Sequence, residues 1–165
     1  MEKKIAITTS SFAKDSHEPL DMLEKAGFQI NRNSLGRTLK SDEIASIVSG
    51  CVGVIAGTET YAESVLKNLK DLRVISRCGI GLDSVDLFTA QKQGIAVLNT
   101  PDAPTPAVSE LVIGLILNLL RQINQQDKEL KAGQWHKRMG SLLKGKTLGI
   151  VGFGRIGQSV AQLAL

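Results

Sequence analysis

The stretch Thr147-Leu-Gly-Ile-Val-Gly-Phe-Gly-Arg-Ile-Gly157 lies close to the end of this 165-residue chain. Its first five residues are typical of a buried strand, and its last six follow the pattern G-x-G-x-x-G. Residues 158–165 then predict a helix. A strand, a glycine turn and a helix in this order are typical of a unit whose helix N-terminus holds a pyrophosphate. The stretch therefore predicts the first β-α unit of a Rossmann domain.

The glycine pattern alone is a weak signal, and its context strengthens it. Gly152, Gly154 and Gly157 are the expected phosphate-turn residues. The alternative interpretation is a plain strand-to-helix turn whose glycines serve packing. The acidic residue that binds the ribose is expected about 20 residues beyond the fingerprint, which is past Leu165.

Upstream of the fingerprint, the first hundred residues alternate between segments typical of strands and of helices. The expected strands cover residues 4–8, 28–30, 53–56, 72–76 and 95–98. The expected helices cover residues 19–25, a segment capped by Ser41, residues 61–69 behind a Thr60/Glu63 capping box, and a segment capped by Asp83 or Ser84 that ends at Gln93. This alternation predicts an α/β fold, with a doubly wound parallel five-stranded sheet in the flavodoxin-like order.

A proline-rich connector follows the fifth expected strand. Three of the four prolines fall within residues 99–106, which favours a rigid link between a unit of residues 1–101 and a unit of residues 102–165. After it, apolar residues recur at helical spacing from Val108 to Ile123, and a polar second half extends the expected helix to Lys131. Gly133 is the expected residue just after its end. This helix is apolar on more than one side, which indicates burial between layers or against a second chain.

Composition excludes several classes of function. The net charge of +4 comes from scattered basic residues without a nucleic-acid motif, so we expect no nucleic-acid partner. Cys51 and Cys78 have no C-x-x-C spacing, which favours a reduced, cytoplasmic protein, and His17 and His136 are too far apart to suggest a metal site. The apolar run of residues 111–120 is about half the length of a membrane span, so we expect no membrane partner.

A candidate ligand loop follows the fourth expected strand, at the edge where open α/β sheets bind ligands. Arg77 could make a charge-assisted hydrogen bond to a carboxylate, and backbone N–H groups around Gly79 and Ile80 could add to it. The alternative is a tight turn with a solvated arginine. Residues 57–60 follow the third strand at the same edge and form a second candidate for ligand contact.

Five sequence blocks, taken together, resemble one known family. The chain is similar to the NAD-dependent D-2-hydroxyacid dehydrogenases, and most of all to their phosphoglycerate dehydrogenase branch. The resemblance runs from about residue 50 to the end and is looser before that. It is carried by Ser76-Arg-Cys-Gly-Ile-Gly-Leu-Asp-Ser-Val-Asp-Leu87, Gly94-Ile-Ala-Val-Leu-Asn-Thr-Pro101, Ala107-Val-Ser-Glu110, Gly133-Gln-Trp135 and Leu143-Lys-Gly-Lys-Thr-Leu-Gly-Ile-Val-Gly-Phe-Gly-Arg-Ile-Gly157.

The resemblance implies a flavodoxin-like substrate lobe into which an NAD-binding Rossmann lobe is inserted. It assigns the substrate carboxylate to Arg77, Gly79 and Ile80. It assigns NAD to the fingerprint and to the start of the long helix, at Gly152, Gly154, Arg155, Ile156, Gly157, Thr105 and Val108. Many phosphoglycerate enzymes of the family have an arginine after the third strand, where this chain has Ala56-Gly57-Thr58.

The family's catalytic arginine, glutamate and histidine all follow the fingerprint, so the resemblance implies no catalytic residue within these 165 residues. We therefore expect a fragment of an oxidoreductase that acts on a D-2-hydroxyacid, with 3-phosphoglycerate as the expected substrate. We expect the chain alone to be inactive and to bind NAD weakly or not at all. The alternative function is a stand-alone flavodoxin-like folding or assembly unit. In either case the apolar long helix favours a homodimer, including a domain-swapped one.

Overall fold

The computed structural model describes residues 3–165. By its contacts the chain forms two compact units, Met1–Pro101 and Asp102–Leu165, and each is described by itself. We refer to them as unit 1 and unit 2.

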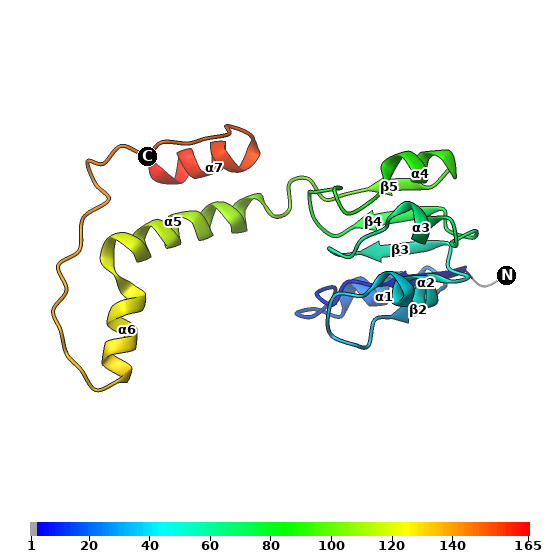
Figure 1. Cartoon of the computed structure of the whole chain (residues 1–165), viewed down its shortest axis with the longest axis horizontal. Helices are drawn as coiled ribbons and strands as arrows, with labels where there is room; N and C mark the ends of the chain where they lie inside the picture. Colours follow the sequence, from blue (N-terminus) through cyan, green and yellow to red (C-terminus); the bar gives the residue numbers. More distant parts are fainter. Residues whose placement is uncertain (1–2) are drawn as a thin grey trace. The chain divides into compact units, whose positions relative to one another are not determined.

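Unit 1 is built on a five-stranded parallel sheet (Figure 1). Its strands are β1 (Lys3–Ile7), β2 (Phe28–Arg32), β3 (Gly53–Ala56), β4 (Val74–Arg77) and β5 (Ala96–Leu98). They lie side by side in the order β2-β1-β3-β4-β5, and all four pairings are parallel. This is the flavodoxin-like order, so the predicted fold class is confirmed.

Alternation along the strands explains which side of the sheet holds the main core. Ala6, Val54 and Ile75 point to one face, where they pack with buried side chains of the helices. These helices are α2 (Ser41–Val48), α3 (Glu63–Leu66) and α4 (Leu87–Lys92). Ile5, Ile55 and Val74 are the strand neighbours of these core residues, so they point to the opposite face of the sheet. They line an apolar hollow of about 320 Å³ together with Leu23 of α1 (Glu18–Lys25), which places α1 on the other face.

Two helices of unit 1 start later than predicted, for one shared reason. Tyr61 and Val85 form a parallel bridge, in which the Tyr61 N–H donates to Ser84 O and the Asp86 N–H donates to Tyr61 O. This pairing holds both segments extended, so α3 begins only after Ala62, and the expected capping box of Thr60 and Glu63 is wrong. The cap of α4 is Asp86 rather than Asp83 or Ser84, and its carboxylate accepts the Thr89 N–H at 2.9 Å.

The start of α2 differs from the prediction by one residue. Lys40 is the N-cap and Ser41 is the first helical residue. The Glu43 carboxylate accepts the backbone N–H of Lys40 at 2.8 Å, so an unpaired donor at the helix start is satisfied from the third helical position. Ser41 therefore does not cap the helix.

Unit 2 contains three helices, α5 (Thr105–Arg121), α6 (Ile123–Lys131) and α7 (Arg155–Ala164). The single long helix expected up to Lys131 is wrong, because Gln122 adopts a left-handed conformation (φ 54°) and α5 and α6 meet at a bend of 64°. Gly133, with φ 72°, follows the end of α6 as expected. In Figure 1, α5 and α7 run side by side, and they make the main packing contact of the unit.

The fingerprint region differs from the prediction at both of its elements. Residues 147–151 do not form the expected strand. A strand needs a neighbouring strand for its backbone hydrogen bonds, and the described residues of unit 2 include none with which residues 147–151 could pair. Helix α7 begins at Arg155, three residues earlier than predicted, because Gly154 already serves as its N-cap.

Candidate functional site

The carboxyl ends of β1, β3 and β4 meet at one edge of the sheet of unit 1. This edge carries a small pocket of about 170 Å³. Side chains from the loops after all three strands line it, together with Thr38 from the loop after β2. Its wall includes Thr9, Ser11, Thr38, Thr58, Glu59 and Arg77. The pocket thus combines hydroxyl groups with one cation and one carboxylate, at the edge where ligands of open α/β sheets bind.

Arg77, the last residue of β4, folds back over its own loop. Its guanidinium lies so close to Gly79 that a Cβ there would sit 2.7 Å from Nη1, and Gly79 has a φ of 145° that disfavours any side chain. One guanidinium N–H donates to the carbonyl of Cys78, while the buried Nε has no hydrogen-bond partner among the described residues. An unpaired N–H of a guanidinium cation suits an anionic ligand group.

The residues after β5 hold this loop in place. The Thr100 N–H donates to Gly79 O, the Gly79 N–H donates to the Thr100 hydroxyl, and the Asn99 amide donates to Ile80 O at 2.8 Å. The Gly79 N–H is therefore already engaged. The Ile80 N–H has no partner among the described residues. Of the two predicted backbone donors, Gly79 and Ile80, it is therefore the Ile80 N–H that is free.

A buried polar cluster of Thr8, Glu59 and Tyr61 lies directly beside the pocket. The Glu59 side chain is only 2% exposed. Its carboxylate accepts the Gly57 N–H at 2.7 Å and the hydroxyl of Thr8. The Tyr61 hydroxyl lies 2.7 Å from Thr8 Oγ1. Burial raises the pKa of the Tyr61 phenol above its usual range, and the nearby Glu59 carboxylate adds to this rise while the Thr8 contact opposes it.

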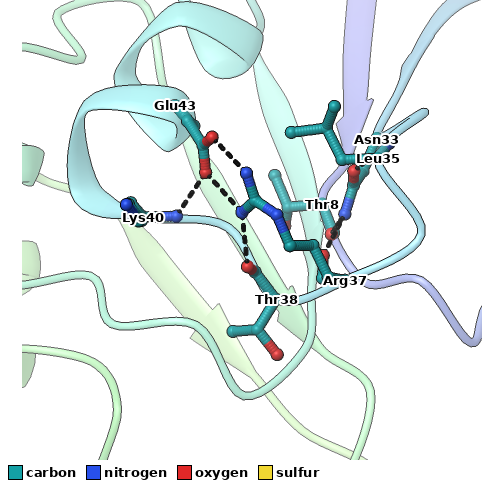
Figure 2. A network of polar contacts seen from close by, with 7 residues as sticks. All are labelled: Thr8, Asn33, Leu35, Arg37, Thr38, Lys40 and Glu43. Carbon is teal, nitrogen blue, oxygen red and sulfur yellow. Dashed lines mark hydrogen bonds and ion pairs between the residues drawn. The ribbon is translucent and has the colours of Figure 1, made fainter.

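The loop after β2 is anchored by a network around Arg37 (Figure 2). The Arg37 guanidinium donates to both carboxylate oxygens of Glu43, at 2.6 and 2.9 Å, and to Thr38 O at 3.0 Å. The Asn33 amide links the loop to β1 by donating to Thr8 O at 2.8 Å. The hydrogen bond from Arg37, with that from the Lys40 N–H, lowers the pKa of Glu43 to about 2. The network fixes Thr38 on the pocket wall.

The fingerprint turn in unit 2 leads directly into the start of α7. Gly152 has a φ of 90°, and its carbonyl oxygen lies too close to the Cβ position of Gly157 for a side chain to fit there without a backbone shift. The first helical hydrogen bond of α7 runs from the Gln158 N–H to Gly154 O at 2.9 Å. The N–H groups of Arg155, Ile156 and Gly157 have no partner among the described residues and therefore point out of the helix start, as anion binding requires.

The start of α5 lies beside the start of α7. The Ser109 and Ser159 hydroxyl groups are 2.8 Å apart, and Arg155 forms an ion pair with Asp102 at 2.7 Å. Thr105 is at the first position of α5, and its buried hydroxyl has no hydrogen-bond partner among residues 3–165. Val108 directly precedes Ser109. Unit 2 therefore brings the predicted helix-start residues close to the predicted phosphate turn.

Sequence reasoning missed the residues that support these sites. Asn99 and Thr100 clamp the Arg77 loop, and the buried role of Glu59 was not expected. One signal was available: a polar residue directly after a strand lies at the ligand edge of a parallel sheet. Within residues 3–165, no group of three or more His, Cys, Asp or Glu could hold a metal ion. Among these residues, no single helix could span a membrane, and only the bent pair of α5 and α6 has the required length and apolarity.

Comparison with known proteins places these features in one family. Residues 5–161 match the family model of the catalytic domain of D-isomer specific 2-hydroxyacid dehydrogenases. The chain belongs to this family. The resemblance inferred from the motifs is thereby confirmed.

Individual 2-hydroxyacid dehydrogenase relatives agree with this assignment. A hydroxypyruvate reductase of Thermotoga maritima is 41% identical over 155 residues, which cover 90% of this chain and 50% of the relative. A D-3-phosphoglycerate dehydrogenase of Sus scrofa is 39% identical over 152 residues, which cover 89% of this chain and 28% of the relative.

Solved structures match nearly the whole length of the chain. The TT0316 protein of Thermus thermophilus matches 98% of this chain and 52% of its own, with a TM-score of 0.88 and 31% identity. The 3-phosphoglycerate dehydrogenase of Entamoeba histolytica, solved with NAD+ bound, matches 99% of this chain and 51% of its own, with a TM-score of 0.79 and 29% identity. The chain thus spans about half the length, or less, of the relatives that it matches.

Proposed function

We propose that this chain supplies the substrate-binding half of an NAD-dependent dehydrogenase for D-2-hydroxyacids. The observation that supports this most strongly is the Arg77 loop. The Arg77 Nε and the Ile80 N–H both belong to the loop at the ligand edge of the sheet, and neither has a hydrogen-bond partner among residues 3–165. A 2-hydroxyacid carboxylate is an anion with two acceptor oxygens, so it can accept from both groups at once.

The residues of the chain have separate parts in this proposal. Arg77 and Ile80 hold the carboxylate, while Asn99 and Thr100 keep the loop in place. This fixes the orientation of the neighbouring C2 atom relative to the sheet edge, and such positioning is a large part of catalysis by dehydrogenases. NAD, when bound, would supply the acceptor for the hydride from C2, while the hydroxyl proton would go to an acid/base group.

The fingerprint residues fit the pyrophosphate of NAD. The N–H groups of Arg155, Ile156 and Gly157, unpaired among the described residues, would hold its oxygens, and the missing side chain of Gly157 lets α7 pack onto the turn. Thr105 and Val108 are proposed to lie near the nicotinamide end. We expect these 165 residues alone to be catalytically inactive, because the substrate carboxylate site and the pyrophosphate turn do not by themselves provide an acid/base group.

Two small acids are candidate substrates for the proposed enzyme. The resemblance favours 3-phosphoglycerate, and this stays a prediction. The name of the Thermotoga relative gives hydroxypyruvate. Both compounds carry a carboxylate next to the reacting carbon, so the Arg77 loop suits either. C2 is an alcohol in 3-phosphoglycerate and a ketone in hydroxypyruvate, and the group at the other end of the molecule is a phosphate in the first and a hydroxyl in the second.

A binding measurement tests the proposed function. D-glycerate, titrated into the ¹⁵N-labelled chain, is expected to shift the amide signals of Gly79 and Ile80. Arg77→Gln should weaken this binding by about tenfold or more, since a charge-assisted bond is lost. Arg73→Gln is the matched control, because Arg73 precedes β4 at the opposite edge of the sheet. A titration that leaves the loop signals unchanged would refute the proposed function.

A further inference from the structure

Glu59 is a buried carboxylate that the proposed function does not use. Only neutral donors hold it, namely the Gly57 N–H at 2.7 Å and the hydroxyl of Thr8, behind which lies Tyr61. Among residues 3–165 it forms no ion pair with a lysine, arginine or histidine. An ionised carboxylate that has no cation paired with it repels an anionic group placed beside it.

The second carboxylate oxygen of Glu59 lies beside the pocket at Gly57. A Cβ at Gly57 would be 2.7 Å from Glu59 Oε2 and 2.8 Å from the Thr9 side chain. A larger residue at Gly57 would therefore collide with both. Because Gly57 has no side chain, Glu59 and Thr9 can both approach its backbone. Glu59, Thr9 and Thr58 therefore line the same small pocket.

Arg77 and Cys78 line this pocket from the β4 side, so the Arg77 side chain and Glu59 border one space of about 170 Å³. A small acid whose carboxylate is held at Arg77 can place its other end in this pocket, among the hydroxyl groups and next to Glu59. A hydroxyl at that end can donate to a carboxylate and accept from a threonine or serine. A phosphate at that end carries close to two negative charges near neutral pH and would meet a like charge.

We propose that Glu59 is a specificity-determining residue, which selects 2-hydroxyacids with an uncharged, hydroxyl-bearing tail and disfavours those with a phosphorylated tail. The inference rests on the proposed function, because it takes the substrate carboxylate to lie at Arg77. Thr8 and Tyr61 act as positioning residues, since their hydroxyl groups line up behind the carboxylate and hold it at the wall.

Three small acids that share the carboxylate and the C2 hydroxyl test the proposal. D-glycerate ends in a hydroxyl, D-lactate in a methyl group and 3-phospho-D-glycerate in a phosphate. Each is titrated into the ¹⁵N-labelled chain while the amide signals of Gly57, Thr58 and Ile80 are followed. We expect D-glycerate to bind most tightly and the phosphorylated acid most weakly, with about a tenfold difference in Kd between them, which corresponds to about 1.4 kcal/mol.

The variant Glu59→Gln isolates the charge, because a glutamine can still accept from the Gly57 N–H and the Thr8 hydroxyl. It should reduce the difference between D-glycerate and 3-phospho-D-glycerate to about threefold or less. Glu63→Gln is the matched control, since Glu63 is exposed in α3 and should leave the ratio unchanged. The comparison of the three acids on the unaltered chain needs no variant, so it stands even if Glu59→Gln fails to fold.

The outcomes separate this inference from the proposed function. Tighter binding of 3-phospho-D-glycerate than of D-glycerate by the unaltered chain would overturn the role of Glu59. A folded Glu59→Gln variant with an unchanged ratio would overturn it as well. Absence of any shift at Ile80 with all three acids would instead refute the carboxylate site at Arg77, and with it the proposed function.

Discussion

The carbonyl oxygen of Gly152 lies against the Cα of Gly157, so close that no Cβ fits between the turn and the helix. This contact joins the two ends of the fingerprint and sets where α7 starts. Of the three fingerprint glycines, Gly152 is needed for its positive φ and Gly157 for this close approach, while a Cβ at Gly154 would meet nothing within 4 Å. The G-x-G-x-x-G pattern therefore has a packing role in this chain.

Gly157→Ala should displace α7 from the turn. Overpacking of this kind costs about 1–3 kcal/mol, and we expect the α7 amides to lose protection in hydrogen exchange by a corresponding amount. Gly114→Ala is the control, because a Cβ there meets nothing within 4 Å in the middle of α5, where alanine favours helix by about 1 kcal/mol. Equal protection of α7 in the Gly157→Ala variant and the unaltered chain would show that the contact is unimportant.

The ion pair of Arg37 and Glu43 should give unit 1 a stability that depends on pH. The pKa of Glu43 falls from its ordinary value of 4.5 to about 2 in the folded chain. Because the folded-state pKa is the lower one, the pair stabilises the fold fully above about pH 4.5. This contribution is lost as the pH falls through about 2.

Urea unfolding of the Glu43→Gln variant checks this dependence. The variant should be less stable than the unaltered chain near neutral pH, and the two should converge as the pH falls from about 4.5 toward 2. Glu63→Gln removes an exposed helical pair with Lys67, and such pairs contribute little, so it should show no comparable change. A gap between Glu43→Gln and the unaltered chain that stays constant down to pH 2 would contradict the role given to this pair.

The exposed apolar side chains of α5 predict self-association. Leu111, Leu115 and Leu119 recur at helical spacing, and Leu119 is 78% exposed. Exposed stripes of this kind mark interfaces in soluble proteins. We expect a homodimer in light scattering and a monomer for Leu119→Glu. An unaltered chain that stays monomeric at high concentration would count against both the ordinary and the domain-swapped dimer.

Binding of NAD to these 165 residues alone should be weak or undetectable. The fingerprint offers helix N–H groups for the pyrophosphate, but Gly152 and Gly154 are exposed, and the described part of unit 2 contains no sheet against which the cofactor could lie. Isothermal titration calorimetry measures this affinity directly. A dissociation constant in the micromolar range would show that the turn is a complete site by itself.

The sequence predicted the sheet well, because strand alternation and the connecting helices leave few parallel orders open. It predicted helix starts less well. The Tyr61–Val85 bridge, which delays α3 and α4, joins two segments well separated along the chain that no local pattern connects. The left-handed conformation of Gln122 and the absence of a strand at residues 147–151 were also not predictable from local sequence. Each of them depends on which tertiary neighbours are present.

The sequence predicted where the residues of the candidate site lie, but it did not predict the contacts that hold them in place. Arg77, Gly79 and Ile80 could be placed at the sheet edge, because residues after parallel strands gather there. The engagement of the Gly79 N–H by Thr100 and the burial of Glu59 depend on contacts between loops. Residue types alone do not specify such contacts, so the wall of the pocket became visible only in the structure.

A chimera tests the central claim, that this chain is the substrate half of a 2-hydroxyacid dehydrogenase. Residues 1–161 would be joined to the matching remainder of the Thermotoga maritima hydroxypyruvate reductase, and NADH oxidation would be followed with hydroxypyruvate, glyoxylate and 3-phosphohydroxypyruvate. We predict turnover that Arg77→Gln removes and Arg73→Gln leaves intact. A chimera that is folded by circular dichroism, yet oxidises NADH with none of these acids under conditions in which the intact Thermotoga enzyme does, would contradict the claim.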